Sequence, residues 1–254
     1  MFDAEMQVFS IPGFSDPVSA LTHLVGSLVF AALGVFLVRK GRRADHPGWN
    51  GRMTALAVFA FAAVAQLAVS GAYHILQPGL RPRLVLQQLD HAAIFVLIAA
   101  SFVPVHVILF NGWRRWLVLL VMVSLAAIGI TLKFLYFDRL PEIAGLAFYI
   151  AMGWAGIYSG YELYRRYGWG FIRPLGWEGI AYTAGGALEF LRGPVLFDGI
   201  VGPHELFHLA VLVGLGLHFR FLFSIAGKRQ GGLSVEAAMP SLSPYPAAGL
   251  PPAR

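Results

Sequence analysis

The chain has 254 residues, of which 57% are hydrophobic and only 13% are charged, and its formal net charge is +6 at pH 7. A soluble domain is usually about one quarter charged, so this composition excludes a disordered chain and argues against an ordinary soluble enzyme. The chain contains no cysteine, which excludes disulfide frameworks, thiolate zinc fingers, iron–sulfur clusters and cysteine nucleophiles. These features together indicate a polytopic membrane protein.

Seven apolar runs approach the roughly 20 residues that a transmembrane helix needs. In chain order they are Pro17–Val38, Met53–Leu76, Leu86–Phe110, Arg115–Leu132, Ile143–Tyr164, Gly176–Leu191 and Pro203–Ala226. The sixth run is the shortest, and it contains Glu178 and Glu189. Segments with turn-forming residues, at 41–48, 77–83, 111–112 and 138–141, separate the first five runs from one another. We therefore predict an all-α integral membrane protein, a seven-transmembrane-helix bundle.

The predicted bundle occupies residues 17–226 and is flanked by two tails. Residues 1–16 are polar enough for a short N-terminal tail and lack the basic and apolar regions of a cleaved signal peptide. Residues 227–254 are rich in Pro, Ser, Ala and Gly, a composition typical of a disordered tail.

Lysine and arginine residues are distributed unequally between the two predicted sides. The side of the N-terminus carries five of the nineteen, namely Arg81, Arg83, Lys133, Arg139 and Arg192, and the other side carries the remaining fourteen. The positive side of a membrane protein is normally cytoplasmic, so we predict the N-terminus outside and the C-terminus in the cytoplasm, in a bacterial inner membrane. The positive charge then indicates contact with anionic lipids, and no nucleic-acid partner is expected.

Polar residues within the apolar runs are costly, and each is therefore a candidate for function. Because consecutive helices alternate in direction, most of these residues fall near the membrane face that the charge distribution assigns as outer. The residues that fall near this face are His23, Ser70, His74, Asp90, His91, Glu189, His204, Glu205 and His208.

The spacing of the histidines indicates a metal site. His204 and His208 are one helical turn apart, so both imidazoles can bind one ion. A third histidine from another helix would complete a three-ligand zinc site with an open position for water, as in catalytic zinc centres. Asp90 could accept a hydrogen bond from this water or orient a ligand imidazole. Ser70, one turn before His74, could bond the water or a substrate carbonyl.

Simpler interpretations apply to several of these residues. His46, His106 and His218 lie in a loop or towards the basic side, where a bond to a backbone carbonyl or a serine accounts for them. His23 and His91 fit either a structural role or the support of a ligand equally well. His204-Glu205-x-x-His208 also matches the H-E-x-x-H pattern of zinc proteases, in which Glu205 would be the general base. The alternative for Glu205 is a carboxylate that the helix dipole favours in the first turn.

The motifs, taken in order over all seven runs, resemble the hemolysin III family, which belongs with the progestin and adiponectin receptors and the alkaline ceramidases. The similarity covers about residues 17–226. The segments that carry it are Thr22-His23-x-x-Gly26, Ser70-x-x-x-His74, Leu89-Asp90-His91, Ser101–Pro104, Gly129–Lys133, Gly153-Trp154, Tyr182–Gly185 and Gly202–Gly214.

This resemblance implies that His74, His204 and His208 are zinc ligands and that Asp90 and Ser70 contact or orient a zinc-bound water. The ceramidase branch implies a zinc-dependent lipid amide hydrolase acting in membrane-lipid homeostasis, with membrane lipids as partners or substrate. A non-catalytic membrane regulator or receptor with structural zinc is the alternative. A cytolytic pore former is disfavoured because the sequence shows seven permanent transmembrane runs and no amphipathic pore-lining helix. A retinal pump is excluded because the last run contains no lysine for a Schiff base.

Overall fold

The computed structural model describes residues 9–44, 51–137 and 139–227. This part of the chain is helical, with two isolated β-bridges and no strand. Its helices are α1 (Pro17–Arg42), α2 (Gly51–Ile75), α3 (Arg81–Leu109), α4 (Trp113–Leu135), α5 (Glu142–Trp154), α6 (Ile157–Tyr167), α7 (Trp169–Leu191) and α8 (Pro203–Ala226). The predicted all-α fold is confirmed.

The eight helices form seven rods because α5 and α6 continue each other across a short break at Ala155 and Gly156. A Cβ atom at Gly156 would lie 3.2 Å from the ring of Phe102, so the glycine allows α3 to approach closely at this break. The interruption lies inside the predicted run Ile143–Tyr164, which the sequence pattern treats as one unbroken helix.

Six of the rods are long and apolar enough to cross a membrane, and α7 is not among them. Its 23 residues are sufficient in length, but they include Arg173, Glu178 and Glu189. The two glutamates point inward, where they pair with histidines of α8. Polar residues inside a membrane bundle face the interior and pair with one another, so α7 fits among the spans through these contacts.

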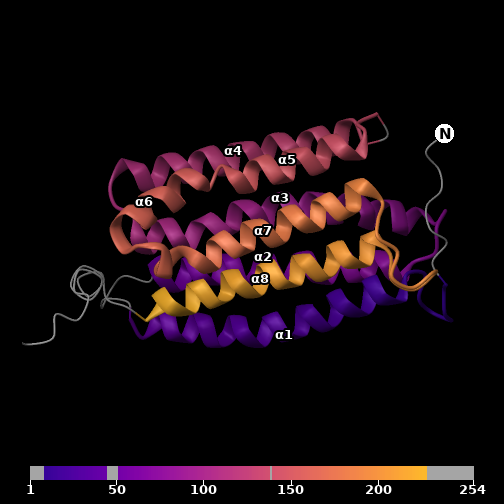
Figure 1. Cartoon of the computed structure of the whole chain (residues 1–254), viewed down its shortest axis with the longest axis horizontal. Helices are drawn as coiled ribbons and strands as arrows, with labels where there is room; N and C mark the ends of the chain where they lie inside the picture. The colour runs from indigo at the N-terminus through magenta and orange to yellow at the C-terminus, as the bar shows by residue number, and fades with distance from the viewer. Residues whose placement is uncertain (1–8, 45–50, 138, 228–254) are drawn as a thin grey trace, which may run out of the picture.

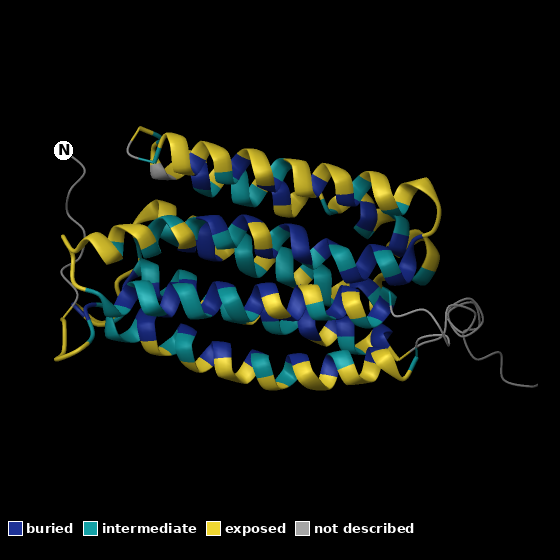
Figure 2. Cartoon of the chain, turned by 180° about the vertical axis from the view of Figure 1, so that it is seen from behind, coloured by how far each residue is buried: buried dark blue, intermediate teal, exposed yellow. Residues whose placement is uncertain are grey.

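Figure 1 shows the rods side by side in layers, with α4, α5 and α6 on one flank, α3 and α7 in the middle, and α1, α2 and α8 on the other. The larger core lies around α2 and α8 and includes Phe59, Phe219 and Leu222, and a smaller core around α3, α4 and α5 includes Phe95 and Met122. Exposed residues dominate the outward surfaces of the rods (Figure 2), and many of them are large and apolar. An apolar exterior is expected of a surface that lipid covers.

Two helices begin five or more residues earlier than the sequence pattern predicts. α3 begins at Arg81 rather than Leu86, and Pro82 is in its first turn, where the missing N–H of proline costs no hydrogen bond. α7 begins at Trp169 rather than Gly176, and Pro174 lies inside it.

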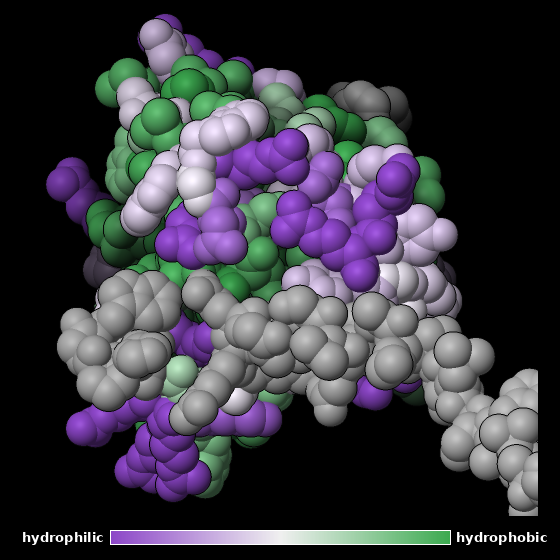
Figure 3. Space-filling model, turned by 90° about the vertical axis from the view of Figure 1, so that its left-hand side faces the viewer, coloured by the Kyte–Doolittle hydropathy of each residue, from purple (hydrophilic) through white to green (hydrophobic). Residues whose placement is uncertain are grey.

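The two ends of the bundle differ in character. α1 and α8 both begin at one end, and both finish at the opposite end (Figure 1). Hydrophilic side chains gather at the second end, which faces the viewer in Figure 3. The last turn of α1, the start of α4 and the end of α6 bring basic residues to this end, namely Arg39, Lys40, Arg42, Arg114, Arg115, Arg165 and Arg166.

Residues 9–16 fold over the other end rather than extending away from it. The backbone N–H of Phe9 donates to the carbonyl of Gly199 at 2.7 Å, and that of Asp16 donates to the carbonyl of His74 at 3.0 Å. The segment just before α1 therefore packs beside the end of α2 and the connection between α7 and α8. The predicted disordered tail lies outside the described residues from 228 onwards.

Candidate functional site

Three histidines meet at the end of the bundle that the N-terminal segment covers. His74 is in the last turn of α2, and His204 and His208 are in the first turns of α8. Each ring offers one nitrogen, and these three nitrogen atoms lie within 4.8 Å of one another. Among the described residues this is the one group of histidines and carboxylates with the geometry to hold a metal ion.

The outer nitrogens of two of these rings donate to carboxylates. His74 Nδ1 lies 2.9 Å from Asp16 Oδ2, and His204 Nδ1 lies 3.3 Å from Glu189 Oε1. Arg83 also donates to Asp16 Oδ2 at 2.9 Å. Burial favours the neutral acid, but the hydrogen bonds from His74 and Arg83 hold the pKa of Asp16 below its usual range. Asp16 is therefore a carboxylate, and it fixes the orientation of the His74 ring.

The inner nitrogens of the same two rings face each other. His74 Nε2 and His204 Nε2 are 3.3 Å apart, the same separation as between His204 Nδ1 and Glu189 Oε1. Two roughly 2.05 Å bonds at the tetrahedral angle of a zinc ion would place their nitrogens about 3.3 Å apart. Because both Nδ1 atoms donate to carboxylates, the two Nε2 lone pairs face each other, and either a proton or a metal ion between them removes their repulsion. The donor set thus fits a metal ion.

His208 completes the group and is itself supported by His23. Both residues are buried, and their rings stack with centroids 3.8 Å apart and 15° between the planes. Nδ1 of His208 and both ring nitrogens of His23 have no hydrogen-bond partner. His23 therefore contributes a flat packing surface to His208, a supporting role that the sequence had left open.

Asp90 and Ser70 line the same cavity as the histidines. Both are buried, and the side chains of Ser70 and Gln66 lie beside the Asp90 carboxyl group. Oδ1 of Asp90 has no hydrogen-bond partner. Asp16 and Glu189, and not Asp90, bond the Nδ1 atoms of His74 and His204. The Oδ1 atom of Asp90 is enclosed beside the group without a partner.

Both carboxylate oxygens of Glu205 are engaged in structural contacts. Ser19 Oγ donates to Oε1 at 3.0 Å, and the backbone N–H of Gly202 donates to Oε2 at 2.9 Å. Glu205 therefore caps the start of α8 and ties it to α1. These contacts favour the structural alternative for Glu205 over the role of a protease-like general base.

The remaining histidines lie apart from the group. His91 stacks against Phe137, with centroids 5.5 Å apart. His106 is bonded to the Phe102 carbonyl and to Ser159, both at 2.9 Å, as the simple interpretation expected. His218 does not follow that interpretation, because its partner is the carboxylate of Glu178 at 2.8 Å. His46 lies outside the described residues.

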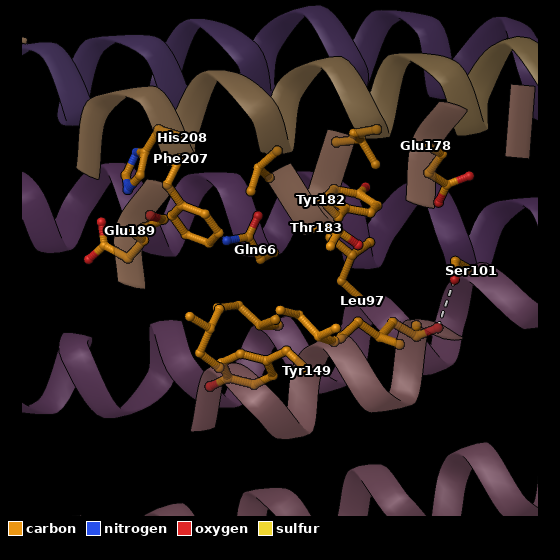
Figure 4. A pocket seen from close by; sticks show the side chains of 18 of the residues that line it. Gln66, Leu97, Ser101, Tyr149, Glu178, Tyr182, Thr183, Glu189, Phe207 and His208 are labelled. Carbon is orange, nitrogen blue, oxygen red and sulfur yellow. Dashed lines mark hydrogen bonds between the residues drawn. The ribbon is translucent and has the colours of Figure 1, made fainter. Parts of the chain in front are cut away.

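A cavity of about 1760 Å³ extends from the histidines into the bundle. In Figure 4, His208 and Glu189 lie at one end of the view and Glu178 at the other, with Gln66, Leu97, Tyr149 and Tyr182 between them. Small-molecule sites usually measure about 300–1,000 Å³. This volume and its largely apolar lining suit a long alkyl chain.

Two functional candidates were missed or left without a role by the sequence. Asp16 falls in the segment read as a tail, yet it accepts a hydrogen bond from His74. Glu189 was a candidate from the sixth run without an assigned role, and its partner His204 is contributed by the next helix. The signal for both was their placement at the membrane face where the histidines gather.

Comparisons with known proteins agree with this architecture. The family described as "Haemolysin-III related" matches residues 14–219. "Hemolysin-3" of Bacillus cereus is 29% identical over 204 residues, which cover 79% of this chain and 87% of that protein. "Heptahelical transmembrane protein ADIPOR2" of Oryza sativa subsp. japonica is 30% identical over 177 residues, 64% of this chain and 77% of that protein. The family match spans most of the chain, which therefore belongs to the Haemolysin-III related family of multi-pass integral membrane proteins.

Proposed function

We propose that His74, His204 and His208 bind a zinc ion in the membrane. The observation that carries this proposal is the 3.3 Å approach of the His74 and His204 Nε2 atoms, each on a ring whose Nδ1 donates to a carboxylate. Imidazole ligands suit zinc, and three protein ligands with an open position are typical of catalytic rather than structural sites. When bound, the ion would polarise a carbonyl group and lower the pKa of a water molecule.

We further propose that the protein hydrolyses an amide bond of a membrane lipid. In this reaction the oxygen of water bonds to the carbonyl carbon, the C–N bond breaks, and a fatty acid and an amine are released. Asp90, with its unpartnered Oδ1, would take the proton of the attacking water and pass it to the leaving amine. Ser70, beside Asp90, would donate a hydrogen bond to the carbonyl oxygen or hold the water.

The cavity supports a lipid substrate rather than a soluble one. Its walls include Leu97, Ile150 and Leu215. Its volume of about 1760 Å³ would accommodate an acyl chain whose reacting end lies at the histidines. The outward faces of the rods carry exposed apolar side chains such as Leu28 and Phe61, which lipid would cover. Lipid amides in the surrounding membrane are thus the substrate class that the site supports best.

We propose that the protein lies in a bacterial inner membrane with its N-terminus outside, an orientation that the charge distribution supports. Basic residues gather at the end opposite the histidines, and such an end is normally cytoplasmic. The zinc site would then face the outer side, and the basic end would contact anionic lipids.

A membrane regulator or receptor with structural zinc is the second candidate. It is favoured by the way the site joins helices: the three histidines connect α2 to α8, while Asp16 and Glu189 add the start of α1 and the end of α7. Loss of zinc would then loosen the bundle without any product being formed. A cytolytic activity, suggested by the name of the Bacillus cereus relative, is not supported by a bundle of membrane-spanning helices.

The primary test is metal analysis of the purified wild type and of the variant carrying both His204→Ala and His208→Ala. We expect about one zinc ion per wild-type chain and almost none in the double variant. A double variant with His91→Ala and His106→Ala removes as many imidazoles outside the group and should retain its zinc. Equal zinc in the wild type and in the His204/His208 variant would remove the basis of the proposal.

A further inference from the structure

A second, smaller cavity lies between α7 and α8, near the basic end of the bundle. Its volume is about 230 Å³, and it shares no lining residue with the larger cavity. Arg173 in the second turn of α7 and Arg220 near the end of α8 both line it, and Ser224 adds a hydroxyl group. Phe171 and Pro174 supply apolar surface. The cavity thus brings two arginines from neighbouring helices to one place.

The two positive charges of this cavity do not depend on a titration, because guanidinium groups stay protonated in proteins. Within the part of the chain that the structure describes, neither Arg173 nor Arg220 has a hydrogen-bonding or ionic partner. The lining also contains no aspartate or glutamate. Elsewhere at this end, by contrast, Arg114 and Arg166 both pair with Glu162. An anion in the cavity would therefore face two guanidinium groups with no competing carboxylate in the lining.

The depth of the two arginines is that expected for lipid headgroups. Arg173 is four residues from the start of α7 and Arg220 is six residues from the end of α8, which corresponds to about 6 Å and 9 Å along the helix axes. Exposed tryptophans occur at the same end, namely Trp113 and Trp116 in the first turn of α4 and Trp169 at the start of α7. Tryptophan is enriched at the interface between membrane and water. The cavity therefore lies close to the level of the lipid phosphates.

Apolar surface continues from the cavity towards the middle of the membrane. Trp177 follows Arg173 by one turn on the same face of α7, and it is exposed. Gly216 precedes Arg220 by one turn on α8, and a Cβ atom there would meet no other atom within 4 Å. The next exposed side chains on these two faces are Ile180 and Val213. An alkyl chain that starts at the cavity would thus lie along an apolar face of each helix.

We propose that this cavity binds the phosphodiester headgroup of an anionic membrane lipid between Arg173 and Arg220. Guanidinium groups bind phosphate oxygens through two parallel hydrogen bonds, and basic pockets between transmembrane helices on the cytoplasmic side suit such headgroups. The acyl chains would lie outside the cavity, against Trp177 and Ile180. This proposal gives the contact between the basic end and anionic lipids a defined site. It depends on neither zinc nor hydrolysis, because the cavity shares no residue with the larger one.

The test compares phosphatidylglycerol with phosphatidylcholine of the same acyl chains, which has the same phosphodiester but also a positive choline group. The full-length protein in a neutral detergent is titrated with each lipid, and mass spectrometry of the intact complexes gives the dissociation constants. An arginine next to an anionic lipid contributes about fivefold to affinity, so we expect the wild type to prefer phosphatidylglycerol by about 30-fold. Equal affinity of the wild type for both lipids would overturn the proposal without any variant.

Substitution then locates the site. Arg173→Gln with Arg220→Gln should lower the preference by about 30-fold, and each single variant should lower it by about fivefold. Arg39→Gln with Arg165→Gln is the matched control, because it removes two exposed arginines of the same end that lie outside the cavity, and it should retain the preference. An equal loss in both double variants would show that the lipid responds to the overall charge of this end, and the defined site would be refuted.

Competition distinguishes a lipid headgroup from a free phosphate ion. Inorganic phosphate in large excess over the lipid, at constant ionic strength, should leave phosphatidylglycerol bound to the wild type, because the acyl chains add contacts along α7 and α8 that the free ion lacks. Displacement of the lipid by inorganic phosphate would show that the two arginines bind a soluble anion, and the assignment to a lipid would be wrong.

Discussion

His74 and His204 approach each other through their Nε2 atoms at 3.3 Å, although one ring is carried by α2 and the other by α8. Each ring is held from behind by its own carboxylate, Asp16 for His74 and Glu189 for His204. The two carboxylates fix which nitrogen of each ring carries the proton. This arrangement directs both lone pairs at one point, where a proton or a metal ion compensates for their mutual repulsion.

The carboxylates behind the rings lead to the first prediction. Asp16→Asn and Glu189→Gln should each weaken zinc binding by about 10–100-fold, because partners of this kind orient the ligands and raise their basicity. Competition with a chelating dye measures the affinity of each purified variant. Glu162→Gln, whose carboxylate pairs with arginines instead, is the matched control and should bind zinc as the wild type does. Wild-type affinity in both site variants would show that the carboxylates have no part in the metal centre.

The contact between Ser19 and Glu205 leads to a second prediction, which concerns stability. Ser19→Ala should lower the free energy of unfolding by about 1 kcal/mol, the usual net value of one hydrogen bond, and Glu205→Ala by about 2–3 kcal/mol because it also leaves the Gly202 N–H and the Ser19 hydroxyl without their acceptor. Unfolding followed in detergent gives both values. Zinc content per folded chain should stay unchanged. A Glu205→Gln variant of wild-type stability that retains zinc but loses turnover would instead support the role of a general base.

The sequence indicates much of the fold because lipid imposes a simple rule on it. An apolar run of bilayer length has few alternatives to a helix, and the alternation of helix direction brings His74, Asp90 and His204 to one face. The spacing of His204 and His208 by one turn is local and needs no knowledge of packing. These features depend on distance along the chain, which the sequence contains directly.

The contacts between helices could not be predicted in the same way. Whether Glu178 meets His218, and whether Glu189 meets His204, depends on the rotation of α7 against α8, which many side chains determine together. Asp16 reaches His74 because the segment before α1 folds over the end of the bundle, and no periodic pattern marks that fold. At the break between α5 and α6, Gly156 lies close to Phe102 of α3, again a tertiary contact.

The unequal distribution of basic residues gives a third prediction, for the orientation in the membrane. An alkaline phosphatase fused after Gly227 should be inactive, because that end of the bundle carries most of the arginines and should remain in the cytoplasm. A fluorescent protein that folds only in the cytoplasm should be active at the same position. The reverse pair of results would place the three histidines on the cytoplasmic side and refute the proposed orientation.

The fourth prediction separates metal binding from chemistry. His208→Ala should abolish both zinc binding and turnover, because it removes a ligand. Asp90→Ala should retain zinc while losing turnover, since the unpartnered Oδ1 of Asp90 is the proposed proton acceptor and a positioned base typically contributes about 10²–10⁴-fold to the rate. Zinc content is measured by elemental analysis, and turnover by the fatty acid released from a set of membrane lipid amides. Full activity in Asp90→Ala would contradict the mechanism, and absence of any product from the wild type, with zinc needed for thermal stability, would favour the structural role of the metal.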